Sequence, residues 1–276
     1  MARAPVGKPN VLGRAFADVR GSVVAVACLC LAFASSGCLG SGGGIFGGGG
    51  PGPKDFVSDD QYTKWVIEVD TVQGQDPPAG VLDFLKGRLV GAVSKPDGVE
   101  IRIDETLPAR GGTWSQKDVL DYSDAHFQTA TSGKTAALHL MFVDGAYEQS
   151  NVLGVTFSRA TGSGRVVETG PVVIFSNSIR SNCGPICASG TTPAFRSVLV
   201  HEFGHAMGLV NSGIDMVKPH EASTCNNAPD HGHSSNTQSV MNCSVETNGI
   251  FSLLNTPPTE YDGDDHADLC NAGGKC

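Results

Sequence analysis

Two histidines and a glutamate lie together in the segment His201-Glu202-Phe203-Gly204-His205. On a helix, His201 and His205 are one turn apart on the same face, so both imidazoles can reach one Zn2+. Glu202 then lies beside the water that completes the coordination of the metal. Zinc lowers the pKa of such a water toward about 7, and a neighbouring carboxylate can take its proton. The motif therefore predicts hydrolysis of a peptide bond, with Glu202 as the general base.

The residues around the motif predict the helix that this chemistry needs. Pro193 follows Thr191 and Thr192, either of which can cap a helix N-terminus, and apolar residues then recur on one face. Gly208 follows the motif and can adopt the left-handed conformation that ends a helix and reverses the chain. We therefore expect a helix that begins near residue 193 and ends near Gly208.

A catalytic zinc site needs a third protein ligand. The polar segment 211–238, whose prolines and glycine predict a loop, holds three candidates: His220, His231 and His233. The loop composition alone leaves all three open.

The spacing around the motif resembles that of the metzincins, whose signature HExxHxxGxxH places a histidine three residues after the glycine. Asn211 occupies that position here. Further on, Ser239-Val-Met-Asn242 resembles the methionine turn of metzincins, which places a Met side chain beneath the metal. His233 and Met241 reproduce the spacing HCxxxxCxM of the archaemetzincins, with serine at both cysteine positions.

The resemblance implies a ligand set. It selects His233 as the third zinc ligand, with His231 and then His220 as the alternatives, and Met241 as the methionine beneath the metal. Residues 209–232 would be an insertion that loops out and returns to the zinc. Because serines stand where archaemetzincins have cysteines for a second, structural zinc, we expect one catalytic zinc.

Strand and helix signals alternate before the motif. Short β-branched or apolar runs predict strands, and amphipathic runs predict helices. In chain order we expect strands at 64–72, 99–103, 136–143, 152–157 and 172–175, with helices at 79–93 and about 115–128 between the first three. This order suits the α+β fold that the resemblance implies: a metzincin-like zincin with a twisted mixed five-stranded sheet, backing helices, an active-site helix and a loop-rich C-terminal subdomain.

The resemblance also implies a role for the fourth strand. In metzincins the edge strand runs antiparallel to the others and pairs with an extended substrate, so residues 154–157 are candidates for main-chain contacts with a peptide or protein. An ordinary edge strand protected by its loops is the alternative. The substrate side chain after the scissile bond would enter a pocket walled partly by residues 242–244. His126 and His139 fit structural positions and receive no role.

The N-terminal residues predict export. Residues 1–20 carry four basic side chains and one acidic one, and the apolar run 21–34 follows, which together indicate a secretory signal peptide over residues 1–37. Ser35-Ser-Gly-Cys38 resembles a bacterial lipoprotein processing site, with Cys38 as the lipid-bearing residue. The resemblance implies a chain anchored by lipid to a bacterial membrane and facing the periplasm or the exterior. An uncleaved membrane anchor is the alternative.

The remaining chain divides into a linker and one domain. Glycine dominates much of residues 38–60, and such a composition predicts a disordered linker after the lipidated cysteine. Residues 61–276 are long enough for one metallopeptidase domain with a sizeable core. We expect an upper subdomain up to about residue 208 and a lower subdomain over 209–276.

Cysteine usage agrees with export. Of nine cysteines, two fall in the signal peptide and Cys38 is assigned to lipid, which leaves an even set of six. The shortest loops predict three disulfides: Cys183 to Cys187, Cys225 to Cys243 and Cys270 to Cys276. The middle disulfide would hold the insertion against the methionine turn.

Charge bounds the partners. The formal net charge is −9, and removing the basic signal peptide makes the chain more acidic still. Nucleic acid is therefore excluded as a partner, and membrane attachment would rest on the lipid. The acidic segment 260–268 could bind Ca2+, but its spacing does not match an EF-hand loop. A short helix capped by Asp262 or Asp264 explains this segment better.

The predicted function is that of an exported, lipid-anchored endopeptidase with a single zinc. Two alternatives stay open. One is a surface binding protein that keeps the metzincin scaffold but has little turnover, although such a protein has no evident need for Glu202. The other is a latent protease, in which the insertion at 209–232 covers the metal.

Overall fold

The structure, a computed structural model, describes residues 49–161, 164–182, 190–225, 228–245 and 257–276. The predicted signal peptide, the lipidation site at Cys38 and the predicted Cys183 to Cys187 disulfide lie outside these residues. Within the part of the chain that is described, none of the helices has the length and apolar character needed to cross a membrane.

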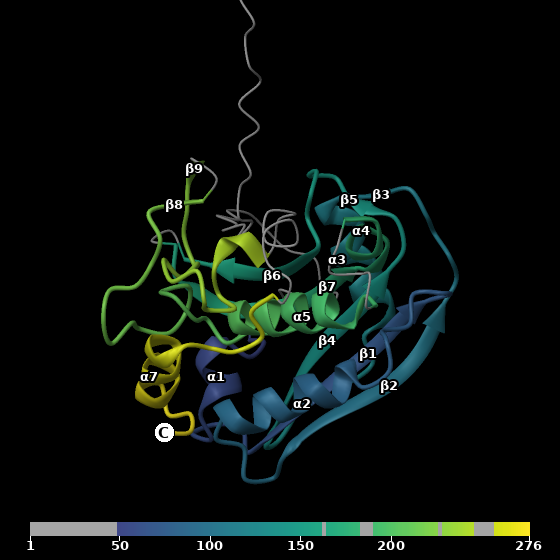
Figure 1. Ribbon diagram of the computed structural model, residues 1–276. Helices are drawn as coiled ribbons and strands as arrows, with labels where there is room; N and C mark the ends of the chain where they lie inside the picture. The colour runs from purple at the N-terminus through teal and green to yellow at the C-terminus, as the bar shows by residue number, and fades with distance from the viewer. Residues whose placement is uncertain (1–48, 162–163, 183–189, 226–227, 246–256) are drawn as a thin grey trace, which may run out of the picture.

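A mixed sheet of five strands in the order β2-β1-β4-β7-β6 forms the centre of the molecule (Figure 1). Its strands in chain order are β1 (Lys64–Val72), β2 (Val99–Leu107), β4 (Thr135–Val143), β6 (Gly154–Ala160) and β7 (Val166–Phe175). The pairs β1–β2, β1–β4 and β4–β7 are parallel, and the edge strand β6 runs antiparallel to β7. The predicted mixed five-stranded sheet is confirmed.

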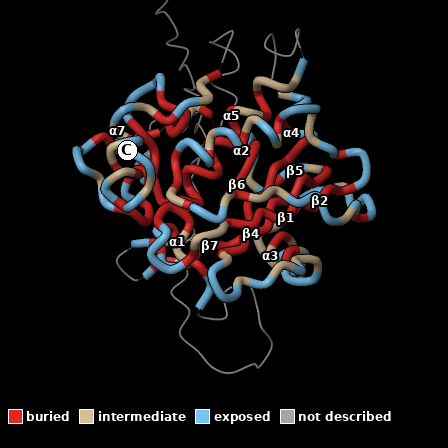
Figure 2. Tube along the Cα trace, turned by 90° about the horizontal axis from the view of Figure 1, so that it is seen from below, coloured by how far each residue is buried: buried red, intermediate tan, exposed pale blue. Residues whose placement is uncertain are grey.

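Helices cover both faces of this sheet. On one face lie α1 (Pro53–Val57), α2 (Val81–Ala92) and α5 (Thr192–Ala206), whose apolar side chains share one buried cluster with the sheet. On the other face α3 (Gln116–His126) packs over a second cluster, beside the short pair β3 (Thr113–Trp114) and β5 (Ala146–Tyr147). The central strands β1, β4 and β7 are consequently buried, as Figure 2 shows.

The strand sequences explain this layering. Strands that are covered on both faces read as nearly continuous apolar runs, and β1 and β4 have such runs. On the face toward α5, Trp65 packs against Phe203 with ring centroids 5.8 Å apart. The central strands therefore form the floor on which α5 is fixed.

The C-terminal part is loop-rich. It holds the short elements β8 (Thr224–Cys225), β9 (Ala228–Pro229) and η2 (Cys243–Val245), and it ends in the helix α7 (Gly263–Asn271). The side chain of Asp262 accepts hydrogen bonds from the backbone N–H groups of Asp264 and Asp265, so the predicted helix cap is confirmed. A further short helix, α4 (Ser176–Asn182), follows β7.

The linker prediction is wrong for the residues just before 60. Residues 53–57 form α1, in which Phe56 and Val57 are fully buried and the Phe56 ring lies 4.8 Å from that of Trp65. Upstream, Pro51 accepts a hydrogen bond from the Thr169 N–H at 3.0 Å. The glycine-rich composition of the preceding residues led to the linker prediction, although the short apolar segment that follows buries its side chains in the core. The domain therefore includes residues 51–60.

Candidate metal centre

Helix α5 carries both histidines and the glutamate of the HExxH motif. It is buried throughout its second half, where it lies between α2 and the β6–β7 edge of the sheet. The helix ends as predicted, because Gly208 has φ 74° and its N–H donates to the His205 carbonyl. A Cβ at Gly208 would come 2.6 Å from Pro53 of α1, so the turn also needs glycine for space.

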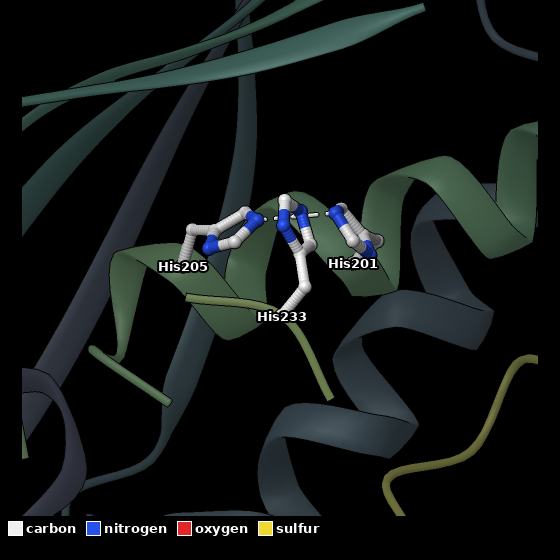
Figure 3. Close-up of side chains that lie close together, drawn as sticks. All are labelled: His201, His205 and His233. Atoms are coloured by element: carbon white, nitrogen blue, oxygen red, sulfur yellow. Dashed lines mark hydrogen bonds between the residues drawn. The ribbon is translucent and has the colours of Figure 1, made fainter. Parts of the chain in front are cut away.

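His201, His205 and His233 converge on one point, the first two from α5 and the third from the loop that follows it (Figure 3). Their ring centroids lie 4.7 to 5.2 Å apart, and the Nε2 atoms of His201 and His205 are 3.0 Å apart. One ligand atom from each ring lies within 4.8 Å of the others, and all three side chains are buried.

Hydrogen bonds determine which nitrogen carries the proton in two of these rings. His201 Nδ1 donates to the Val240 carbonyl at 2.6 Å, and His233 Nδ1 donates to the Asp230 carboxylate at 2.9 Å. In neutral imidazoles the Nε2 atoms of His201 and His233 then carry lone pairs. Three imidazoles that converge in this way are a donor set for Zn2+ that keeps a fourth position for water. The residues present therefore fit a catalytic zinc.

The two alternative ligands lie outside this cluster. The His231 side chain is 87% exposed and its Nδ1 lies 3.2 Å from a Glu221 oxygen. His220 is buried, but its Nε2 points at α7, 3.4 Å from an Asp265 oxygen and 3.6 Å from an Asp268 oxygen. Of the three candidate histidines, only His233 lies beside His201 and His205 of α5.

Asp230 is the residue that sequence reasoning missed. It is buried and stands three positions before His233, so its carboxylate can hold the imidazole in the orientation and tautomer that a metal ligand needs. A carboxylate three residues before a candidate histidine ligand is the sequence feature that could have identified it.

Met241 packs directly under α5. A Cβ added at Gly204, inside the motif, would come 2.1 Å from the Met241 sulfur, so a larger residue here would displace the Met241 side chain. The turn is held in place because Ser234 N–H donates to the Met241 carbonyl and Met241 N–H donates to Ser239 Oγ. Ser239 Oγ also donates to Asp265 of α7 at 2.6 Å, which joins the turn to the C-terminal helix.

Tyr261 ties the last part of the chain to the same helix. Its hydroxyl donates to the Val200 carbonyl at 2.8 Å, one residue before the motif. Burial raises the pKa of Tyr261 well above its usual range, so the phenol remains a hydrogen-bond donor.

Residues 209–233, which include the predicted insertion, are held by a disulfide and by hydrogen bonds. Cys225 is bonded to Cys243, as expected, and the second expected disulfide, Cys270 to Cys276, is also formed. Ala222 N–H donates to the His233 carbonyl at 2.8 Å, and Gly232 N–H donates to the Glu221 carboxylate at 3.0 Å. These contacts fix the loop segment that delivers His233.

Glu202 is fully buried beside the edge strand β6. The Thr156 hydroxyl lies 2.8 Å from the Glu202 carbonyl and 2.9 Å from its carboxylate oxygen Oε2. A Cβ at Gly154 would come 2.8 Å from Glu202 Cγ. The strand with the predicted substrate-pairing residues is therefore also the strand that contacts the predicted base.

Comparisons with known proteins identify no family. No family model matches the sequence, and no curated protein matches it either. Among solved structures the chain is similar to an archaemetzincin from Methanopyrus kandleri, with 13% sequence identity and a TM-score of 0.44 over 76% of this chain and 96% of that chain. At this identity few side chains are shared.

Proposed function

We propose that this chain is a zinc-dependent endopeptidase. The observation that supports it most strongly is the convergence of His201, His205 and His233 in a buried cluster, with Glu202 adjacent to His201 on the same helix. Two of the rings present Nε2 to the cluster because their Nδ1 atoms donate to Val240 and Asp230. A histidine triad with a neighbouring carboxylate is the arrangement that metal-assisted hydrolysis requires.

Each residue then has a distinct task. Zinc bound at this centre supplies a Lewis acid and a water of lowered pKa. His201, His205 and His233 are the ligands, and Asp230 orients His233. Glu202 takes the proton from the attacking water and passes it to the leaving amine. Met241 packs against Gly204, which lies between the two histidines of the helix in sequence.

The edge strand supports a peptide as the substrate. Among the strands that the structure describes, β6 pairs only with β7, so its other edge has no strand partner there. An extended peptide can add to such an edge by main-chain hydrogen bonds, which suits a substrate recognised mainly through its backbone. We assign this role to residues 154–157.

The cellular setting of the proposal comes from sequence. The predicted signal peptide over residues 1–37 and the predicted processing site at Cys38 support an exported, lipid-anchored enzyme. Metabolic labelling with a fatty acid should therefore mark the wild-type chain and leave Cys38→Ala unlabelled. Labelling of both proteins, or of neither, would contradict the lipid anchor.

The test is peptide cleavage by the zinc-loaded full chain, measured by mass spectrometry on a diverse peptide library beside Glu202→Gln. We expect cleavage of internal peptide bonds by the wild type. The glutamine variant should bind the same amount of zinc and lose about a hundredfold or more of the rate, as expected on removing a general base. Equal cleavage by both proteins would contradict the proposal.

A wild type that binds zinc but cleaves no peptide would instead support the binding protein or the latent protease. Limited proteolysis within residues 209–232 separates these two, because only a latent enzyme should gain activity.

A further inference from the structure

The two faces of strand β6 contact different elements of the molecule. Side chains alternate along a strand, so residues 154 and 156 face one way and residues 155 and 157 the other. Val155 and Phe157 belong to the buried cluster on the α3 face of the sheet. Gly154 and Thr156 face α5, where both contact Glu202.

Gly154 leaves the space that the Glu202 side chain occupies. A Cβ at this position would lie 2.8 Å from both Cγ and Oε1 of Glu202 and 2.9 Å from a Val198 methyl. The Gly154 backbone has no left-handed conformation, so its need for glycine comes from the close approach of the helix. Any larger residue here would push the Glu202 side chain or move the strand.

Thr156 holds the same side chain by a hydrogen bond. Its hydroxyl is buried and reaches both the backbone carbonyl and carboxylate oxygen Oε2 of Glu202. A hydroxyl has one proton, so it donates to one of these oxygens at a time or shares the proton between them. A donor of fixed position that points at a buried carboxylate restricts the rotamers available to that carboxylate.

We propose that Gly154 and Thr156 are positioning residues for Glu202, with Gly154 making room for the carboxylate and Thr156 holding its Oε2. This inference rests on the proposed function, in which Glu202 is the general base. Since β6 is also the strand that would pair with the substrate, one strand sets the positions of both the peptide and the base. A general base needs such placement, because proton transfer requires hydrogen-bond distance to the reacting water.

Thr169 of the neighbouring strand β7 offers a matched control. Its hydroxyl is also buried and donates to a carbonyl of α5, that of Ala206, at 3.2 Å. Both threonines therefore tie a strand to the same helix, but only Thr156 reaches a carboxylate. A merely structural role for Thr156 predicts equal effects of Thr156→Val and Thr169→Val.

The experiment measures kcat and KM of Thr156→Val, Thr156→Ser and Thr169→Val on a peptide that the wild type cleaves, together with zinc content and melting temperature. We expect Thr156→Val to lower kcat about tenfold, the size of one hydrogen bond to a charged group, with KM changed less than about twofold. Thr156→Ser keeps the hydroxyl and should restore kcat. Thr169→Val should keep the wild-type kcat, and Gly154→Ala should lower it at unchanged zinc content.

A second readout needs no substrate. Acetohydroxamic acid binds zinc after giving up a proton, and a neighbouring carboxylate can hold that proton, so its affinity for the zinc-loaded protein depends on where the base lies. Thr156→Val should weaken this binding in the same direction as Glu202→Gln, and Thr169→Val should leave it unchanged.

The outcomes separate the two proposals. Wild-type kcat and hydroxamate affinity in Thr156→Val, or equal losses in Thr169→Val, would overturn the positioning role while the peptidase stands. A wild type that binds zinc but cleaves nothing would contradict the peptidase, and the hydroxamate measurement would still decide the role of Thr156. A wild type that binds no zinc would overturn both.

Discussion

The candidate metal centre and a second buried cluster, Glu68, Asp70 and His139, make an instructive comparison. Among the described residues, both groups bring ligand-type atoms within 4.8 Å of one another, and both are buried. Burial and the presence of metal-ligating residue types therefore do not distinguish them.

Hydrogen bonding does distinguish them. In the second cluster both nitrogens of His139 have protein partners, Ser123 Oγ at 2.7 Å and Asp70 Oδ2 at 2.9 Å. Glu68 accepts a hydrogen bond from the Gln128 N–H and pairs with Arg102, both at 2.7 Å. Protein donors thus meet the needs of these groups, and the cluster joins β1, β4 and α3 as a structural network.

At the candidate metal centre the partners are of another kind. The Nδ1 atoms of His201 and His233 donate to Val240 and Asp230, and the Nε2 atom of His201 meets another imidazole nitrogen, Nε2 of His205, at 3.0 Å rather than a carboxylate. The comparison teaches that a metal site is marked by imidazole nitrogens that face one another once their partner nitrogens are bonded.

The largest expected effect is on zinc affinity. His233→Ala removes a ligand and should weaken zinc binding more than about a hundredfold, since loss of a residue that merely supports a ligand costs about 10- to 100-fold. His139→Ala, in the other cluster, and His231→Ala, on the exposed loop, should keep wild-type affinity. Competition with a chromophoric chelator measures all three. Loss of zinc in His231→Ala with retention in His233→Ala would reverse the ligand assignment.

A smaller effect is expected from the residue behind the ligand. Asp230→Asn keeps the shape of the side chain but weakens its hold on His233 Nδ1, and should lower zinc affinity about 10- to 100-fold. Asp70→Asn makes the same change beside His139 and should lower the free energy of unfolding with no change in zinc affinity. If both variants bind zinc as tightly as the wild type, Asp230 has no role in the centre.

The loop disulfide sharpens the comparison further, because the structural network joins regular elements whereas the third ligand comes from a loop. The Cys225 to Cys243 bond closes a loop with a sequence separation of 18, for which loop entropy predicts about 3 kcal/mol of stability. The double serine variant should lose roughly this free energy of unfolding and bind zinc more weakly. The matched variant at Cys270 and Cys276, with a separation of 6, should lose less and keep its zinc affinity.

The smallest expected effect concerns His220 and the two acidic residues of α7 that lie near it. Asp265 Oδ1 and Asp268 Oδ2 are buried and have no hydrogen-bond partner among the residues the structure describes, although both lie near His220 Nε2. Burial raises the pKa of Asp265 to about 6. The folded chain therefore binds a proton more tightly than the unfolded chain, and stability from this group is lost as pH rises from about 4 to about 6.

Asp265→Asn removes this titration. Its free energy of unfolding should rise relative to the wild type as pH increases through that window, by no more than about 3 kcal/mol. Urea unfolding of the zinc-free proteins at several pH values measures the difference, in which titrations common to both proteins cancel. A difference that is constant with pH would show that Asp265 does not titrate there.

The sequence predicts the elements well where the signal is local. Apolar periodicity places the five main strands, and the proline and glycine at the two ends of α5 mark its limits because they act within a single turn. The ends of β2 and β7 extend beyond their apolar runs, since pairing with neighbours continues through polar residues.

Contacts between residues that are far apart in the chain could not be predicted from local sequence patterns. Residues 53–57 are hidden by neighbouring glycines, although Phe56 and Val57 enter the core. The contact of Thr156 with Glu202 joins positions 46 apart in the chain, and neither residue signals the other. His233 could be singled out only through its spacing to Met241, because loop composition does not separate it from His220 and His231.

The most direct test of the central claim is a crystal structure of the zinc-loaded chain measured at the zinc absorption edge. We expect one anomalous peak, about 2.0 to 2.1 Å from Nε2 of His201, His205 and His233. A peak at Glu68, Asp70 and His139 in its place, or no peak among the three histidines with zinc in excess, would contradict the account.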